Sequence, residues 1–177
     1  SPITYTVTAE DETTQEYTVT VTVSAPIRNP VIIVPGLFGT EISKTIDGEP
    51  DKLWFDFGRI LTDIGDEFMD ALQFNSDLTP SDMNLTIGEV IKKEIVNLIV
   101  VGVKVFDYSN GLIEEFENQG YVEDTDLFLF PYDWRYGVSE DNVNKLKQKN
   151  VDILEQTNAN EVDVIAHSTG GLLVKKY

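Results

Sequence analysis

Cysteine is absent from the sequence, so disulfide bridges and thiolate-bound metal sites are excluded. A chain without cysteine suits reducing and oxidising compartments alike. Long hydrophobic runs are missing too, because no stretch approaches the roughly 18 apolar residues of a transmembrane helix. The first residues lack the basic and then apolar order of a signal peptide, and the chain starts at Ser1 without methionine. We therefore expect no transmembrane segment, no metal or other cofactor, and a processed or excised form of a longer protein.

Basic residues are scarce. The chain has 13 Lys and Arg against 31 Asp and Glu, which gives a formal net charge of -18. Such a surface repels nucleic-acid phosphates and anionic lipid headgroups, so nucleic acid is not an expected partner. Contact with a lipid surface would have to depend on apolar side chains. Hydrophobic residues make up 41% of the chain, as in ordinary folded proteins.

Residues 1–25 alternate between polar and apolar side chains. Threonine interleaves with valine and tyrosine on either side of a polar turn at residues 10–16, a period of two that predicts two half-buried strands. A lone hairpin is marginal in water, so we interpret it as the remnant of a β-sandwich module. The segments ITYTVTAED and EYTVTVTV resemble immunoglobulin-like and cadherin-like modules of bacterial surface proteins. Ser24, Ala25 and Pro26 are typical of a linker.

Residues 26–177 alternate short apolar runs with amphipathic segments. The runs at 31–34, 127–130 and 162–165 are typical of strands buried on both faces of a parallel sheet. A helix is expected from Ser109–Gly111 to Gly120, and a longer one is marked by Val143, Leu146, Val151 and Leu154. This order predicts right-handed βαβ units and the α/β fold class.

An insertion at about residues 41–106 is too long for an ordinary connection. Residues 60–72 place apolar side chains at helical spacing opposite acidic ones, which predicts an amphipathic helix. The apolar set is Ile60, Leu61, Ile64, Phe68, Ala71 and Leu72. The insertion either covers the mouth of an active site or is a structural excursion. The acidic side chains lack the ligand spacing of a calcium loop and indicate a solvated face.

The strongest chemical signal is VDVIAHSTGGLL at residues 162–173. A buried strand that runs through Ala166, His167, Ser168, Thr169 and Gly170 into an apolar helix has the pattern of a nucleophile elbow. The tight turn projects the serine hydroxyl above the sheet and needs small residues at Ala166 and Gly170. Ser168 is therefore the predicted nucleophile. The Thr169 N–H, at the start of the helix, is one expected oxyanion donor.

The second oxyanion donor is expected in the loop after the first central strand, VPGLFGT at residues 34–40. Pro35 and Gly36 turn the chain so that the Leu37 N–H can point into the site, unless the pair only ends a strand. His167 is the only histidine, and its side chain leaves the backbone in another direction from that of Ser168. We interpret it as a packing residue of the elbow. In this fold the acid and the histidine follow the nucleophile, so we expect a fragment that is inactive alone.

Several motifs occur in the order of a known family. VIIVPGLFG, LWFD, GYV and PYDWR precede the elbow at residues 31–39, 53–56, 120–122 and 131–135. Together they resemble the lecithin:cholesterol acyltransferase and lysosomal phospholipase A2 family of α/β-hydrolases from about Pro30 to Tyr177. The resemblance implies an α/β-hydrolase fold with a lid insertion and an acyl group carried by Ser168. It also implies oxyanion donors at Leu37 and Thr169, with Trp54 and Phe55 in the lid and acyl-binding region.

The resemblance has two departures and one ambiguity. The lid disulfide of the animal enzymes cannot form without cysteine, and their sequences lack the β-rich leader. Asp133 and Arg135 are either a catalytic pair or, as we favour, an ion pair that staples the loop after a strand.

Three functional hypotheses follow. The first is an extracellular or surface-attached bacterial lipase, phospholipase or acyltransferase that acts on lipid esters through an acyl-enzyme, with contact to an interface through the lid. The second is a non-catalytic surface binding module on a hydrolase-like scaffold. In the third, the fragment assembles with another chain to complete the sheet. The oligomeric state, the headgroup and the acyl length are left open.

Overall fold

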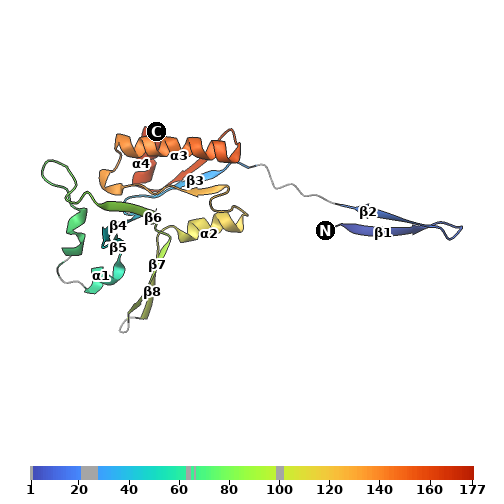
Figure 1. Ribbon diagram of the computed structural model, residues 1–177, viewed down its shortest axis with the longest axis horizontal. Coiled ribbons are helices and arrows are strands. Elements are labelled where there is room, and N and C mark those ends of the chain that lie inside the picture. The colour runs from blue at the N-terminus through green and yellow to red at the C-terminus, as the bar shows by residue number, and fades with distance from the viewer. Residues whose placement is uncertain (1, 21–27, 63–64, 66, 99–101) are drawn as a thin grey trace.

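A three-stranded parallel sheet is the centre of the fold. The computed structural model describes residues 2–20, 28–62, 65, 67–98 and 102–177. Strand β3 (Val31–Val34) lies between β10 (Asp163–Ala166) and β9 (Leu127–Leu129), as Figure 1 shows. Both pairings are parallel. The predicted parallel sheet of the α/β class is therefore confirmed.

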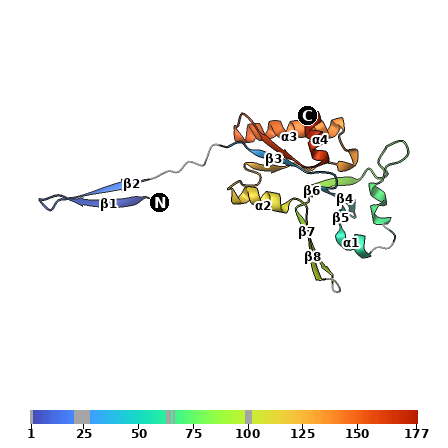
Figure 2. The ribbon, with the colours of Figure 1, turned by 180° about the vertical axis from the view of Figure 1, so that it is seen from behind.

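Strand β3 is buried on both faces because all four of its side chains are branched and apolar. Their exposed fractions lie between 0% and 3%. Alternate residues of a strand point to opposite faces. Ile32 and Val34 face a core that includes side chains of α3 (Glu140–Thr157) and α4 (Thr169–Lys176), while Val31 and Ile33 pack with Ile113 of α2 (Asn110–Asn118). The sheet thus separates α2 from α3 and α4 (Figure 2).

The helices largely follow the sequence pattern. Helix α2 ends before Gly120, which has φ +85°. Helix α3 begins at Ser139, whose Oγ accepts a hydrogen bond from Asn142 N at 3.2 Å. The prediction that Val151 belongs to the apolar face was wrong, since Val151 is 45% exposed and Ile153 is buried. Ile153 is seven residues, about two helical turns, beyond the buried Leu146 and shares its face, whereas Val151 is five residues beyond Leu146 and does not. No helix within the described ranges is long and apolar enough to cross a membrane.

The insertion forms an antiparallel sheet that the sequence did not predict. Its order is β5-β4-β6, from β4 (Thr40–Ile46), β5 (Glu49–Trp54) and β6 (Leu85–Val90). A hairpin of β7 (Lys93–Leu98) and β8 (Gly102–Asp107) follows.

The single amphipathic helix expected over residues 60–72 was wrong. The structure has two short helices there, α1 (Phe57–Thr62) and the 3-10 helix η1 (Glu67–Leu72), and neither contains a buried residue. Gly65 lies between them, and glycine costs roughly 1 kcal/mol in a helix interior relative to alanine. Ile64, one of the expected apolar residues, lies outside the described residues.

The N-terminal segment forms the predicted antiparallel hairpin, with β1 (Ile3–Thr8) paired to β2 (Thr14–Val19). The turn is shorter than expected, because β2 already begins at Thr14. Half-burial was wrong: every residue of both strands is exposed, so neither face packs in a core. The linker at Ser24, Ala25 and Pro26 lies outside the described residues. Membership of a β-sandwich module stays a prediction.

Candidate active site

The turn from β10 to α4 places Ser168 in a strained, exposed position. Ser168 has φ 53° and ψ -123°, a region that residues with a side chain rarely adopt and that costs about 1–3 kcal/mol. Three backbone hydrogen bonds hold the turn: His167 N to Val34 O at 3.1 Å, and Gly170 N to His167 O and Gly171 N to Ser168 O, both at 2.9 Å. The Ser168 hydroxyl caps no helical N–H. This is the backbone geometry that a nucleophile elbow requires.

Gly170 brings α4 against the end of β3. A Cβ at Gly170 would lie 2.4 Å from Pro35 O and 2.7 Å from Val34 O, closer than any carbon can approach an oxygen without a bond. Ala166, the last residue of β10, pairs with Val34 in the parallel ladder. Small residues at these two positions therefore let the elbow close onto the strand that leads into the loop at residues 35–40.

That loop runs directly beside the elbow. A Cβ on Gly36 would lie 2.9 Å from Ser168 Cβ and 3.0 Å from His167 Nδ1. Gly39 N–H donates to Gly36 O at 3.1 Å, which closes a turn around Leu37 and Phe38. Because C=O and N–H of a trans peptide unit point in opposite directions, the Leu37 N–H is directed away from the inside of this turn.

Both expected oxyanion donors are available. The Leu37 N–H has no acceptor among the residues that the structure describes. Thr169 is the first residue of α4, where backbone N–H groups have no partner within the helix. The structure thus brings the Ser168 elbow and the Leu37 loop together, and the helix N-terminus adds a favourable field for negative charge.

Of Trp54 and Phe55, both expected in an acyl-binding region, Trp54 lies against the same loop. Trp54 Nε1 donates to Phe38 O at 2.8 Å, and the two rings are 4.8 Å apart. Phe38 also contacts Trp134 edge to face, with the ring centroids 4.7 Å apart, and Phe55 packs on Trp54 at 5.2 Å. An aromatic surface therefore borders the turn that carries the Leu37 N–H.

His167 is exposed, yet its side chain lies against the loop, since a Cβ on Gly36 would be 3.0 Å from His167 Nδ1, and its packing role in the elbow stays a prediction. Its ring contacts that of Tyr108 edge to face, with the centroids 6.2 Å apart, just beyond the carboxyl end of β10. Within the described ranges the Ser168 hydroxyl makes no hydrogen bond to a histidine or a carboxylate. In the same part of the chain, no group of three or more His, Asp or Glu side chains could hold a metal ion.

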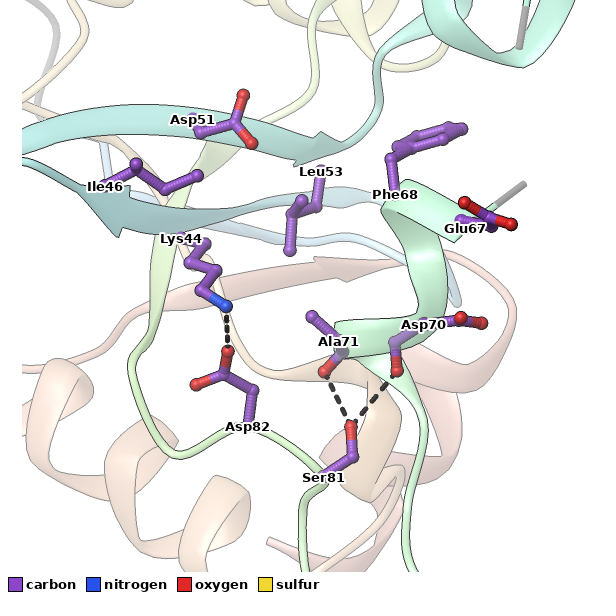
Figure 3. Close-up of a pocket in the computed structure, with 10 residues that line it drawn as sticks. All are labelled: Lys44, Ile46, Asp51, Leu53, Glu67, Phe68, Asp70, Ala71, Ser81 and Asp82. Atoms are coloured by element: carbon purple, nitrogen blue, oxygen red, sulfur yellow. Dashed lines mark hydrogen bonds and ion pairs between the residues drawn. The ribbon is translucent and has the colours of Figure 1, made fainter. Parts of the chain in front are cut away.

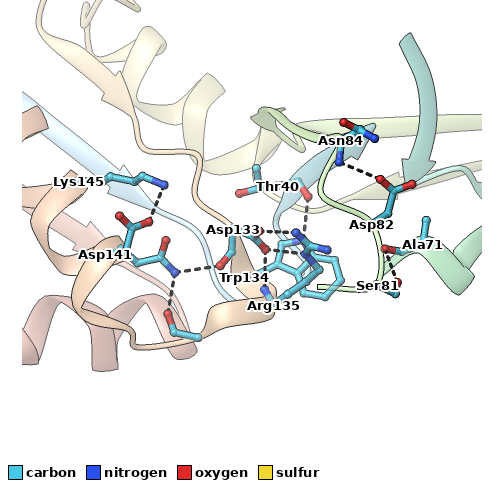
Figure 4. Close-up of polar contacts among 12 residues, drawn as sticks. Thr40, Ala71, Ser81, Asp82, Asn84, Asp133, Trp134, Arg135, Asp141 and Lys145 are labelled. Carbon is cyan, nitrogen blue, oxygen red and sulfur yellow. Dashed lines mark hydrogen bonds and ion pairs between the residues drawn. The ribbon is translucent and has the colours of Figure 1, made fainter. Parts of the chain in front are cut away.

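Asp133 and Arg135 form the expected ion pair in the loop after β9 (Figure 4). Arg135 donates from Nε to Asp133 Oδ1 at 2.9 Å and from Nη2 to Oδ2 at 2.6 Å. The two side chains are only 9% and 6% exposed. Asp133 also begins the 3-10 helix η2 (Trp134–Tyr136), and its backbone oxygen accepts Asn142 Nδ2 at 2.9 Å. The ion-pair interpretation is confirmed.

Asp133→Asn should destabilise the isolated chain by about 3 kcal/mol, because it leaves the buried guanidinium without its counter-charge. Urea unfolding followed by tryptophan fluorescence would measure the loss. The matched control is Asp141→Asn, which breaks the 2.7 Å pair with Lys145 on the exposed face of α3 and should cost less than about 1 kcal/mol. Equal losses in the two variants would contradict a structural role for the buried pair.

Two cavities differ in their relation to the elbow. One of about 460 Å³ lies between the β4–β5 hairpin and η1 (Figure 3), where Lys44 pairs with Asp82 at 2.6 Å. None of its lining residues belongs to the elbow or the loop. The other, of about 320 Å³, adjoins the elbow and is lined in part by Pro35, Tyr108 and His167. Of these two cavities, only the second lies beside the residues that flank Ser168, although Ser168 and Leu37 do not line it.

Comparison with known proteins points to one family. The family model for lecithin:cholesterol acyltransferase matches residues 99–177. The chain is also 26% identical over 162 residues to lecithin-cholesterol acyltransferase-like 4 of Arabidopsis thaliana, an alignment that covers 85% of the chain and 30% of that protein. The resemblance to the lecithin:cholesterol acyltransferase family is confirmed, and the chain spans less than a third of the length of this relative.

Proposed function

We propose that this chain supplies the nucleophile of a serine esterase or acyltransferase that acts on lipid esters. The observation that carries the proposal is the contact between two elements: a strained, exposed Ser168 and a loop whose Leu37 N–H is free to donate. A serine in this backbone conformation, next to two unpaired amide donors, suits acyl transfer. Similarity to the acyltransferase family supports the same class of substrate.

The reaction would proceed in two steps. As a general base removes the hydroxyl proton, Ser168 Oγ bonds to the ester carbonyl carbon, and the N–H groups of Leu37 and Thr169 stabilise the oxyanion. The tetrahedral intermediate then breaks its bond to the alcohol, which takes the proton and leaves an acyl group on Ser168. Water or a second alcohol attacks the acyl-enzyme, gives up its proton to the base and regenerates the serine.

The general base is proposed to lie outside these 177 residues. In α/β-hydrolases the acid and the histidine follow the nucleophile along the chain. His167 lies beside Ser168 in sequence and is not proposed as that base. The isolated chain should therefore be catalytically incomplete, and activity belongs to a longer polypeptide that contains it.

A lipid-like substrate is supported by the surroundings of the loop. Phe38 and Trp54 place aromatic side chains at the loop that carries the proposed oxyanion donor, and Phe55 packs on Trp54. An acyl chain would need apolar contact at this place. The net charge of -18 disfavours an anionic surface as the docking partner. A lid role for the insertion and a bacterial cell-surface location are part of the same proposal.

Covalent labelling tests the proposal. In the longer polypeptide, an alkyl fluorophosphonate should lose fluoride and bond to Ser168 Oγ, and mass spectrometry of the elbow peptide should find the adduct on that residue. Hydrolysis of short p-nitrophenyl esters should stop as the label accumulates. If the polypeptide is neither labelled nor active, the serine esterase is excluded and the non-catalytic binding module becomes the better account.

A further inference from the structure

Every backbone carbonyl from residue 35 to residue 40 accepts a hydrogen bond. Two of the donors are backbone N–H groups: Gly39 N to Gly36 O at 3.1 Å and Ile91 N to Gly39 O at 2.9 Å. The other four are aromatic side chains, here called the aromatic donors. They are Tyr132 Oη to Pro35 O at 3.1 Å, Tyr108 Oη to Leu37 O at 2.7 Å, Trp54 Nε1 to Phe38 O at 2.8 Å, and Trp134 Nε1 to Thr40 O at 3.0 Å.

The turn that these donors hold is in an unfavourable form for its sequence. Gly36 to Gly39 is closed by one hydrogen bond, and Phe38 has φ +68° while Leu37 has no positive φ. A positive φ at the third residue alone defines a type II turn, in which that position favours glycine. With Leu37 and Phe38 at its centre, a type I turn would avoid the steric cost.

The difference between the two turn types is the orientation of the central peptide unit. That unit contains the Leu37 carbonyl, and a change from type II to type I turns this carbonyl to the opposite side. Tyr108 Oη donates to this oxygen. The hydrogen bond therefore opposes the change by stabilising the type II orientation, which the side chain of Phe38 disfavours.

Tyr108 is itself well anchored. Its backbone N–H donates to Lys92 O at 3.0 Å, and its ring contacts His167 of the elbow. A Cβ on Gly39 would lie 2.6 Å from Tyr108 Cε1, so the ring lies directly against the loop. Burial raises the pKa of the Tyr108 hydroxyl, so it remains a protonated donor at neutral pH.

We propose that Tyr108 is a positioning residue that holds the Leu37–Phe38 turn in its type II form and keeps the turn in place beside Ser168, so that the Leu37 N–H, whose own peptide unit closes the turn, stays directed at the oxyanion. This inference rests on the proposed serine chemistry. Leu37 lies between two peptide units, one fixed by Gly39 N–H and the other by Tyr108, and together they fix its φ and ψ. Loss of the tyrosine hydroxyl frees the second unit, so the turn and its Leu37 N–H lose their fixed position beside Ser168 and oxyanion stabilisation weakens.

Tyr108→Phe in the active polypeptide should lower kcat for p-nitrophenyl esters about tenfold and leave KM within about twofold, a smaller loss than the 10²–10³ for removing an oxyanion donor. The matched control is Tyr121→Phe. The Tyr121 ring packs on Phe116 at 5.1 Å, and its hydroxyl has no hydrogen bond in the part of the chain that is described. An unchanged kcat in Tyr108→Phe, or an equal fall in both variants, would overturn the proposal.

Hydrogen–deuterium exchange gives a second readout that needs no catalysis. In the 177-residue chain, Tyr108→Phe removes an anchor of the turn, so the turn should open more often and the Gly39 N–H, whose hydrogen bond both turn types can form, should exchange faster. Tyr121→Phe should leave this exchange unchanged. Unchanged exchange in Tyr108→Phe would also overturn the proposal. If the wild-type longer polypeptide is inactive but the Gly39 N–H loses protection in Tyr108→Phe, the proposed serine chemistry is wrong. If the wild-type polypeptide is active and Tyr108→Phe has the same kcat, the proposed role of Tyr108 is wrong.

Discussion

Ser168→Ala is expected to reduce ester hydrolysis by the longer polypeptide about 10⁴-fold or more, to the rate that oxyanion stabilisation and binding alone provide. Alanine retains the elbow backbone and removes only the hydroxyl that would bond to the acyl carbon. The loss should therefore fall on kcat, since substrate still meets the same aromatic surface. Steady-state kinetics with a short p-nitrophenyl ester would measure it, and the fluorophosphonate adduct should disappear.

Ser139→Ala is a suitable control for this substitution. Ser139 caps α3 through its hydroxyl and lies outside the elbow and the loop. Its loss should lower stability by about 1 kcal/mol and leave kcat at the wild-type value. Hydrolysis by Ser168→Ala at the wild-type rate would end the proposal that this serine carries the acyl group, whatever the control shows.

The sequence was informative where structure is determined locally. The apolar run at residues 31–34 has no polar position, so burial on both faces and a central place in the sheet followed directly. The strand, the tight turn and the helix start around Ser168 were equally clear, because these three elements are contiguous in the chain. The Asp133–Arg135 pair, two residues apart, was also within reach of sequence reasoning.

Structure that depends on distant partners was not predicted. The antiparallel sheet of the insertion joins β4 to β6 across an intervening pair of short helices, and no local period marks that pairing. The aromatic donors reach the loop from far along the chain: Tyr108 is 71 residues from Leu37, and Tyr132 is 97 residues from Pro35. Burial raises the pKa of Tyr132 to about 12.

The buried hydroxyl of Tyr132 makes a hydrogen bond that the hydrophobic pattern of the sequence does not predict. In the hydrophobic pattern of the sequence, Tyr132 counts as an apolar core residue. In the structure its hydroxyl remains protonated and donates to the loop beside Ser168. A sequence signal does exist in retrospect, since aromatic residues with a hydrogen-bond donor recur in the LWFD and PYDWR motifs. Their shared target, the carbonyl groups of the loop at residues 35–40, is defined only by the tertiary structure.

Gly170→Ala should destabilise the isolated chain by about 4 kcal/mol or more, beyond the usual 1–3 kcal/mol of core overpacking. The added methyl group would meet Pro35 O at 2.4 Å and Val34 O at 2.7 Å. Both atoms belong to the backbone of β3 and its loop, so no side-chain rotation can relieve the contact. Relief requires α4 to move away from the sheet, which would separate Ser168 from Gly36.

Gly171→Ala provides the matched control one residue further along α4. Nothing lies within 4 Å of a Cβ at that position, and alanine in place of a helical glycine should stabilise the chain by about 0.5–1 kcal/mol. Urea unfolding of the two variants should therefore shift the midpoint in opposite directions. Because both substitutions add one methyl group to the same helix, the opposite signs would isolate the contact with Pro35 and Val34. A Gly170→Ala chain as stable as wild type would show that the elbow does not close against β3 in this way.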